Sequence, residues 1–239
     1  MINLIIAGLL LPLVTSLLLF RRPRRPAGGW VATLVLSTGM TLFAFFAVPW
    51  GFLGMPLRWT VAAVFVIAVT VSLIRKPDER SDDSPTRMLL KILIGMFFGS
   101  VALSVIRANS QPPGAVDLAF PFARGTFSVL HGGSTTAANT YFGRGAEGFA
   151  VDLAGDINNE LVSPCDGNVT SQKPLRIRCG DVDVEMTTAE ALQLGPVRRG
   201  ASVGHVTGDY LHLFASRNKQ AVPVTFEGRW LVRNERISR

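Results

Sequence analysis

Residues Trp30–Val48 read WVATLVLSTGMTLFAFFAV, a run of 19 residues without a charged side chain. As a helix, such a run is close to the roughly 20 residues that cross about 30 Å of hydrocarbon. Three similar runs share the same half of the chain: Ile2–Phe20, Trp59–Ile74 and Met88–Ile106. None of them shows the polar stripe at 3.6-residue spacing that a surface helix of a soluble protein carries. The sequence therefore predicts four transmembrane helices within residues 1–106.

Two of these runs need a further argument. Trp59–Ile74 has only 16 residues, but Phe52–Leu57 can extend it through the turn at Pro56. Ile2–Phe20 could instead be a signal peptide. Its charges follow the apolar stretch, however, and no small-residue cleavage site precedes Arg21. We therefore interpret both runs as membrane spans.

The basic residues between the runs predict which side of the membrane each loop faces. Arg21–Arg25 holds four arginines and no acid, and Arg75–Arg87 is again rich in basic residues, whereas Arg58 is alone in its loop. Lys and Arg accumulate on the cytoplasmic side of membrane proteins. We therefore expect a multi-pass protein of the cytoplasmic (inner) membrane, with residues 107–239 outside the cytoplasm and the lipid bilayer as a partner.

The net charge of +7 has no bearing on nucleic acids once it is divided between the two halves. Residues 1–106 hold 10 Lys/Arg and 4 Asp/Glu, and residues 107–239 hold 14 and 13. A nucleic-acid binder would carry its basic residues on the folded domain. The excess of positive charge therefore indicates membrane topology, and we expect no nucleic-acid partner.

Residues 107–239 are predicted to form a tether and one compact domain. The tether, residues 107–117, is polar and contains two prolines, and the domain covers residues 118–239. Short alternating segments separated by Gly, Asn and Asp are typical of strands joined by hairpins, and only Thr187–Leu194 has a helical pattern. The fold class is therefore a multi-domain membrane protein, with four transmembrane α-helices followed by a mainly-β extracytoplasmic domain, a barrel or a sandwich. Strands are expected at Phe127–Leu130, Gly148–Leu153, Gly167–Thr170, Leu175–Cys179, Val182–Met186 and Val222–Phe226.

The only two cysteines, Cys165 and Cys179, both lie in this outer half. Outside the cytoplasm such a pair can persist as a disulfide, and closing a loop of this size contributes about 3 kcal/mol on the chain-entropy account. Two buried free thiols are the alternative, and no Cys-x-x-Cys spacing indicates a redox pair. We favour the disulfide.

The residues alone predict no metal site. A zinc hydrolase needs three protein ligands, an open position for water and a base. The chain has three histidines, His131, His205 and His212, and neither an HExxH helix nor a ligand-spaced Cys/His pattern. Isolated histidines of this kind are more often structural than metal-binding.

Several segments in the outer half nevertheless resemble lysostaphin/LytM-type zinc metallopeptidases, which have a duplicated hybrid motif β-barrel. Ala146–Thr170 reads AEGFAVDLAGDINNELVSPCDGNVT, and it matches a strand ending in an Asp ligand (Phe149–Asp152) followed by a Pro-x-x-Gly turn (Ser163–Val169). Tyr210–Ala215 looks like the family's His-x-His strand, and Val222–Gly228 like its closing strand. The resemblance covers nearly the whole outer half and implies hydrolysis of cell-wall peptides with zinc.

Carried over residue by residue, the resemblance leaves an incomplete site. It places metal ligands at Asp152 and His212, but the family's first histidine falls on Gly148 and its candidate base on Tyr210. Some membrane-tethered relatives carry histidines further upstream, after an Asn, where this chain has Asn139-Thr140-Tyr141. Two ligand-type residues therefore stand where three are expected, and the sequence assigns no catalytic residue.

His205 and His131 are the available substitutes for the third ligand, although neither follows the family's pattern. Two protein ligands would hold zinc weakly, because affinity depends on ligand number and on fixed supporting partners. Zinc is therefore expected to be weakly bound or absent. Tyrosine is also a poor base near neutral pH.

Three functions remain open. The first is a membrane-anchored, degenerate peptidase-like domain that binds a cell-wall peptide or a partner protein without cutting it. The second is an active zinc metalloendopeptidase of peptidoglycan peptides with a rearranged ligand set. The third is a membrane protein whose outer domain assists the assembly of a partner. Because fold does not carry function by itself, the missing ligands favour the first.

Overall fold

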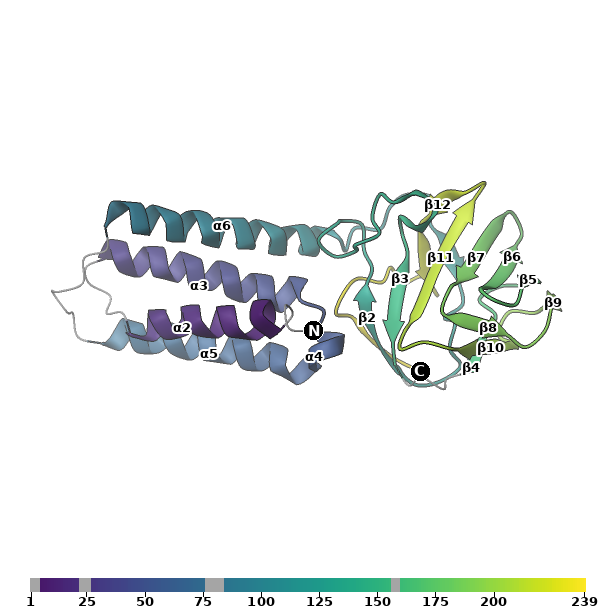
Figure 1. The fold of residues 1–239 in the computed structure, drawn as a ribbon, viewed down its shortest axis with the longest axis horizontal. Coiled ribbons are helices and arrows are strands. Elements are labelled where there is room, and N and C mark those ends of the chain that lie inside the picture. Colours follow the sequence, from purple (N-terminus) through teal and green to yellow (C-terminus); the bar gives the residue numbers. More distant parts are fainter. Residues whose placement is uncertain (1–4, 22–26, 76–83, 156–159) are drawn as a thin grey trace. The chain divides into compact units, whose positions relative to one another are not determined.

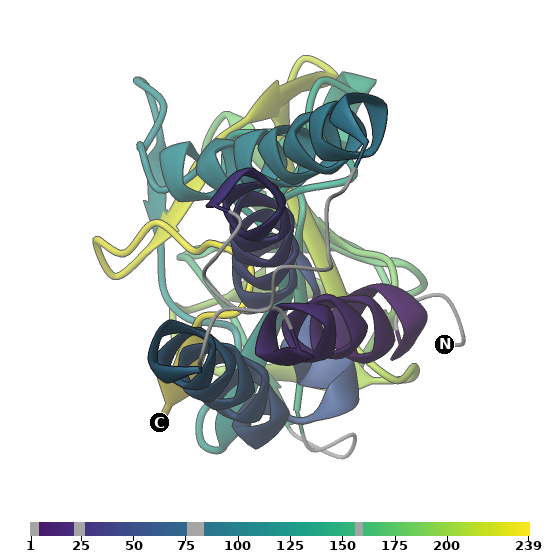
Figure 2. The same ribbon diagram turned by 90° about the vertical axis from the view of Figure 1, so that its left-hand side faces the viewer.

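The chain divides into two compact units, Met1–Ile106 and Arg107–Arg239. The first consists of helices and the second is mainly β (Figure 1, and Figure 2 at right angles). The computed structural model describes residues 5–21, 27–75, 84–155 and 160–239.

Among the described residues of the first unit, three helices are long and apolar enough to cross a membrane. Residues 2–4 of the first expected span, Ile2–Phe20, lie outside the described residues, and its described part forms a shorter apolar helix, Ile6–Arg21. This helix contains a π-helical turn, where the amide of Leu11 bonds to the carbonyl of Ile6 immediately before Pro12. The helices are η1 (Ile6–Leu10), α2 (Leu11–Arg21), α3 (Ala27–Ala47), α4 (Trp50–Leu53), α5 (Met55–Ile74) and α6 (Pro85–Arg107).

Small polar side chains are buried between these helices, and large apolar ones face outward. Ser37 is fully buried and its hydroxyl donates to the carbonyl of Thr15 at 2.7 Å, which satisfies it without water. On α6, by contrast, Leu90 and Phe97 are each more than half exposed. Such a surface would be unfavourable in water, whereas lipid tails would cover it. The distribution therefore fits a unit that anchors the chain in a membrane.

Two glycines allow α3 and α6 to approach closely. A Cβ atom placed on Gly39 would lie 2.0 Å from the carbonyl oxygen of Gly95, which is closer than any side chain tolerates. In membranes, helices associate through packing of this kind, because lipid supplies no hydrophobic force between them. The contact therefore depends on glycine at both positions.

The second unit is built on a nine-stranded sheet that carries the candidate site. Antiparallel pairing joins its neighbours, and no barrel is closed by the strands that the structure describes. Its order is β14 (Arg236–Ser238), β2 (Thr126–His131), β3 (Val151–Ala154), β11 (Leu211–Arg217), β7 (Val182–Met186), β6 (Leu175–Cys179), β5 (Gly167–Ser171) and β9 (Gly195–Val197), with β12 (Gln220–Val222) beside β11.

Two smaller sheets complete the second unit, which confirms the expected mainly-β domain. One is β4 (Glu160–Val162), β10 (Ser202–Val206) and β8 (Ala189–Ala191), and the other is the parallel pair β1 (Val116–Leu118) and β13 (Val224–Phe226). The helical prediction for Thr187–Leu194 was wrong. Ala189 and Ala191 are buried on alternate positions and pair with β10, so tertiary contacts make this segment a strand.

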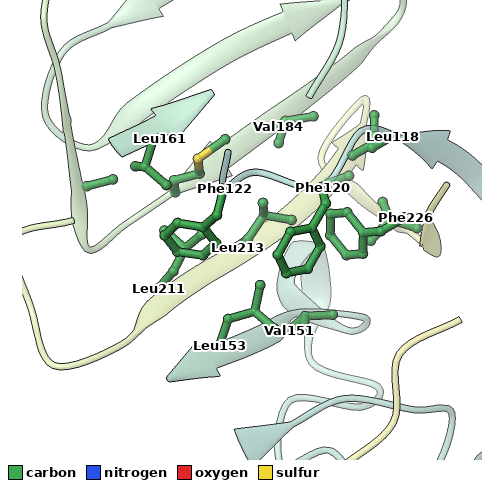
Figure 3. Packing of buried hydrophobic residues seen from close by; sticks show 14 of the residues in the cluster. Leu118, Phe120, Phe122, Val151, Leu153, Leu161, Val184, Leu211, Leu213 and Phe226 are labelled. Carbon is green, nitrogen blue, oxygen red and sulfur yellow. The ribbon is translucent and has the colours of Figure 1, made fainter. Parts of the chain in front are cut away.

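The two faces of the large sheet have opposite chemistry. On β6, Leu175 and Ile177 are fully buried, whereas Arg176 and Arg178 between them are exposed. The buried face packs around Leu213 and a cluster of phenylalanines to form the core (Figure 3). The opposite face presents polar and charged side chains, and the candidate site lies there.

The expected disulfide between Cys165 and Cys179 is present, with a Cα–Cα distance of 5.9 Å. It links the segment that precedes β5 to the end of β6, 14 residues along the chain. The bond therefore fastens one edge of the sheet that carries the polar face.

Candidate functional site

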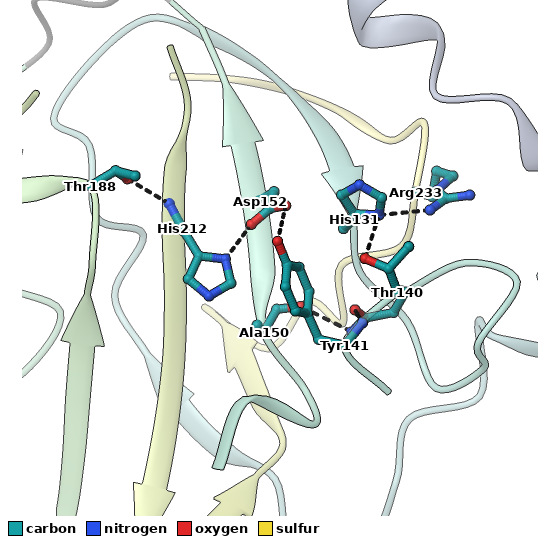
Figure 4. A network of polar contacts seen from close by, with 9 residues as sticks. His131, Thr140, Tyr141, Ala150, Asp152, Thr188, His212 and Arg233 are labelled. Carbon is teal, nitrogen blue, oxygen red and sulfur yellow. Dashed lines mark hydrogen bonds and ion pairs between the residues drawn. The ribbon is translucent and has the colours of Figure 1, made fainter. Parts of the chain in front are cut away.

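Asp152 and His212 form the centre of the site. They are direct cross-strand partners on β3 and β11, so their side chains leave the sheet on the same face. The Nδ1 atom of His212 lies 2.5 Å from Oδ1 of Asp152, and only 6% and 1% of the two residues are exposed. The structure therefore brings together the two ligand-type residues that the sequence singled out (Figure 4).

Tyr141 closes this pair from the loop that precedes β3. Its hydroxyl donates to Oδ2 of Asp152 at 3.3 Å, and its ring centroid lies 4.7 Å from that of His212. Burial raises the pKa of Tyr141, and the neighbouring charge of Asp152 raises it further. The phenol therefore stays protonated and remains a donor. As a result, both carboxylate oxygens of Asp152 have partners within the chain.

A buried asparagine holds Tyr141 in this position. The side-chain amide of Asn139 donates to the carbonyl of Ala150 at 3.0 Å, just before β3 begins. Its side-chain oxygen accepts from the backbone amide of Tyr141, also at 3.0 Å. Asn139 is fully buried, so these bonds are shielded from water. The loop is thus fastened to the strand that carries Asp152.

His131 is adjacent to the site, but its imidazole is hydrogen-bonded to Arg233. His131 is the partner of Asp152 on β2, after a bulge in the ladder, and its ring centroid is 5.9 Å from that of Tyr141. Nη2 of Arg233 lies 2.7 Å from Nδ1 of His131 (Figure 4). Burial, followed by the charge of Arg233, lowers the pKa of His131 to about 4. The imidazole is therefore neutral at pH 7, with Nδ1 accepting from the guanidinium.

Arg233 is itself fixed by backbone carbonyls. Its Nε donates to Leu130 at 3.0 Å and its Nη1 to Ala137 at 2.8 Å. Burial lowers the pKa of Arg233 to about 10, although the charge of Asp152 opposes this shift. The guanidinium remains charged at pH 7 and joins the end of β2 to the following loop, which makes His131 a structural acceptor.

The remaining candidates lie apart from this network. His205 is exposed on β10, in the separate three-stranded sheet, where its cross-strand partners are Glu160 and Glu190. A Cβ atom on Gly148 would lie 3.2 Å from the Cβ of Ala221, which is its nearest neighbour. Position 148 therefore faces β12, and Tyr141 is the loop residue that reaches Asp152.

The residues present do not fit a zinc centre. Within the described part of the chain, no group of three or more His, Cys, Asp or Glu side chains could hold a metal ion. Asp152 is bonded to His212 and Tyr141, and Nδ1 of His131 faces Arg233. A metal would have to displace these partners and would then lack a third protein ligand. In this arrangement both oxygens of Asp152 and Nδ1 of His131 already have hydrogen-bond partners within the chain.

A groove with a volume of about 440 Å³ runs along the same face of the sheet, next to this network. Side chains of β5, β6, β7 and β11 and of the β11–β12 turn line it, together with η2 (Gly145–Glu147). Its Phe214 is two residues along β11 from His212, with ring centroids 5.8 Å apart. The volume lies within the usual range for ligand sites. The groove therefore adjoins the network through Phe214.

Comparisons with known proteins add little to this geometry. No known family profile matches the chain, and no curated protein sequence matches it. A search of solved structures found one described as "Structure of Helicobacter pylori Csd3 from the hexagonal crystal", with 20% sequence identity and a TM-score of 0.35. The match covers 48% of this chain and 34% of that chain, so it spans about a third of that protein's length. A similarity of this size carries no argument about fold or activity.

Sequence reasoning missed Tyr141 and Arg233 as members of the network. Tyr141 stands in the segment Asn139-Thr140-Tyr141, where the resemblance had placed histidines of some relatives, so a signal for its location existed. Arg233 follows Trp230-Leu231-Val232, and nothing in that segment indicates that it would reach a histidine about 100 residues earlier.

Proposed function

We propose that this chain is a membrane-anchored, extracytoplasmic domain of peptidase-like design that binds a cell-wall peptide or a partner protein without hydrolysing it. One observation carries the proposal. The hydroxyl of Tyr141 donates a hydrogen bond to the second oxygen of Asp152. A hydrolytic site would need a metal ligand or an open metal position at this place. The pair Asp152–His212 is retained, but as part of a closed hydrogen-bond network.

Hydrolysis requires more than these two residues. A metal peptidase must hold the ion with three ligands, keep one position open for water and place a base beside it. Here the protonated phenol of Tyr141 takes the place of the third metal ligand. Tyr210, immediately before β11, stands where the resemblance would place the base. Asp152 is almost fully buried and both of its oxygens are hydrogen-bonded within the chain, which supports binding rather than catalysis.

The orientation of the domain rests on the positive-inside rule. The Arg-rich segments Arg21–Arg25 and Arg75–Arg87 lie largely outside the described residues, so the argument comes from sequence alone. With both segments in the cytoplasm and four crossings, the second unit faces the cell wall. A disulfide in that unit supports the same side, because such bonds persist in oxidising compartments.

An active zinc metalloendopeptidase is the second candidate, favoured by the direct pairing of Asp152 with His212. Rotation of Tyr141 away from Asp152 would expose both side chains. The enzyme would still need a third ligand, and His131 would have to give up its contact with Arg233. This candidate therefore requires two rearrangements.

Replacement of Tyr141 by histidine tests the proposal. An imidazole at position 141 would stand beside Asp152 and His212 and would complete a three-ligand set, so Tyr141→His should bind zinc at least about tenfold more tightly than the parent. Gly148→His is the matched control, because its side chain would face Ala221 and should leave zinc affinity unchanged. Isothermal titration of the full chain in detergent micelles measures all three affinities.

The zinc affinity of the unmodified chain is the decisive result of this titration. Tight zinc binding by the unmodified chain, lost in Asp152→Ala, would contradict a non-catalytic site. Equal zinc affinity in the parent and Tyr141→His would show that residue 141 does not stand at the position of the third metal ligand. A gain in Gly148→His would instead mean that the loop before β3 lies differently against Asp152.

A further inference from the structure

The groove beside the network contains two ion pairs, and the charges cancel within each pair. Arg176 on β6 contacts Glu185 on β7 at 2.6 Å, and Arg178 pairs in the same way with Asp183 two residues further along the strands. These are direct cross-strand partners, so each guanidinium lies opposite a carboxylate. Together the four side chains form one wall of the groove with no net charge.

A third cation, Lys219, lies at the rim formed by the β11–β12 turn. It lines the groove, and no acidic partner contacts it among the residues that the structure describes. Its ammonium group therefore gives the groove a net positive charge. A ligand with a carboxylate would find there a charge that the protein does not satisfy internally.

The turn that carries Lys219 is short and is constrained by the two strands that it joins. Arg217 and Gln220 are the last pair of the β11–β12 hairpin, so Asn218 and Lys219 form a two-residue loop. Both have positive φ, 52° and 64°, as a type I′ turn requires. Non-glycine residues adopt this conformation at some cost in energy. The hairpin thus fixes the backbone of Lys219 at the rim.

The floor of the groove suits an uncharged peptide segment. Ser216 and Thr170 offer hydroxyl groups, and Phe214 offers a largely buried aromatic edge. The groove extends along β11 from Lys219 toward His212, so a ligand bound at the rim would continue toward the closed network. Small or apolar side chains fit such a floor better than charged ones.

A second depression in the same unit lacks an unmatched charge. Its volume is about 190 Å³, and its two arginines are paired within the chain: Arg229 with Glu235 and Arg239 with Glu227. It is smaller than most ligand sites. Of these two depressions, only the larger groove has a charge without a partner among its described residues.

We propose that this groove binds the carboxylate end of a short, extended peptide, with the ammonium group of Lys219 contacting the carboxylate and Phe214, Ser216 and Thr170 contacting the preceding residues. The inference rests on the proposed function and names its ligand class. It assigns recognition to Lys219, a residue outside the Asp152–His212 pair.

Two peptide probes that differ in one group test this assignment. Acetyl-trialanine with a free carboxylate should bind the full chain in detergent micelles about fivefold more tightly than its C-terminal amide, as expected for one partly exposed ion pair. Lys219→Met keeps the apolar stem and removes the charge, so it should abolish the preference. Lys173→Met is the matched control, because Lys173 pairs with Glu190 outside the groove. Ligand-detected NMR or calorimetry measures these affinities.

Each outcome decides the inference separately from the proposed function. Equal binding of acid and amide, a preference that survives Lys219→Met, or no binding of either peptide would overturn it. A preference lost in Lys173→Met as well would show that overall charge, rather than the groove, attracts the peptide. Cleavage of the probe would contradict the proposed function and leave carboxylate recognition standing.

Discussion

The two units of this chain treat large apolar side chains differently: the helical unit exposes many of them, and the β unit buries most of them in its core. On α6, Phe97 is 62% exposed, whereas Phe127 on β2 is 1% exposed. Nothing in the chemistry of phenylalanine distinguishes the two positions. The difference follows from what surrounds each unit, because apolar surface gains free energy only when it leaves water. Burial within the chain therefore measures hydrophobic stabilisation only for a unit that water surrounds.

Buried polar groups also differ between the units. In the helical unit they are hydroxyls. Some bond to carbonyls, as Thr33 does to Gly29 at 2.8 Å, whereas those of Ser16 and Thr41 have no hydrogen-bond partner among the described residues. In the β unit they include a carboxylate and an imidazole, Asp152 and His212, bonded to each other across strands. Short local bonds satisfy a single group, whereas the cross-strand network positions several groups on one face. The first arrangement serves packing, and the second marks a site.

The largest difference between the two units is expected when one leucine in each is truncated to alanine. Leu213 is fully buried in the β core and Leu93 on α6 is 55% exposed. Leu213→Ala should destabilise its unit by about 2–5 kcal/mol through lost burial and a cavity. Leu93→Ala should change stability by less than about 0.5 kcal/mol, because lipid replaces the lost contacts.

Hydrogen exchange with mass spectrometry, on the full chain in nanodiscs, reports on the two units separately. A loss for Leu93→Ala as large as that for Leu213→Ala would contradict the lipid-facing interpretation of α6. It would indicate instead that another protein surface packs on that face.

A smaller effect concerns pH and should be confined to the β unit, which holds all three histidines. Because the folded-state pKa of His131 is about 4, below its ordinary value of 6.5, the unfolded chain binds a proton in this range that the folded chain does not. Stability is therefore complete above pH 6.5 and falls as the pH decreases toward 4. After a discount for partial exposure, we expect a loss of about 1 kcal/mol.

The variant His131→Gln isolates this contribution from that of the carboxylates. It cannot titrate, so the difference in stability between variant and parent should shrink as the pH is lowered from 6.5 to 4. Thermal unfolding of the β unit at several pH values measures the difference. A constant difference across this range would mean that His131 is not held neutral by burial and Arg233.

The sequence predicted the elements that depend on local patterns. Alternation of apolar and polar residues located Leu175–Cys179 and Val182–Met186 to the residue, because one face of each strand is buried. The expected strand Val222–Phe226 was divided in two, since Pro223 has no amide for the ladder and ends β12 before β13 begins. Local pattern failed at Thr187–Leu194, where pairing with β10 decides the conformation.

The candidate site was predictable only in part, for a related reason. Asp152 and His212 lie on strands whose order the resemblance supplied, so their pairing could be expected. The contact between Arg233 and His131 joins a turn to the end of β2, about 100 residues earlier, and the two segments follow no shared pattern. The role of Tyr141 depends on how Asn139 fastens its loop, which no spacing encodes. Long-range loop contacts of this kind become visible only in the folded chain.

Whether the Asp152–His212 site is catalytic is decided by an assay of the unmodified chain for hydrolysis. The full chain in detergent micelles is incubated with peptidoglycan fragments and excess zinc, and the products are analysed by mass spectrometry. Because Tyr141 closes the Asp152–His212 pair, we predict no cleavage beyond that seen with the Asp152→Ala variant. Cleavage by the unmodified chain that Asp152→Ala abolishes would contradict this account and establish a zinc peptidase.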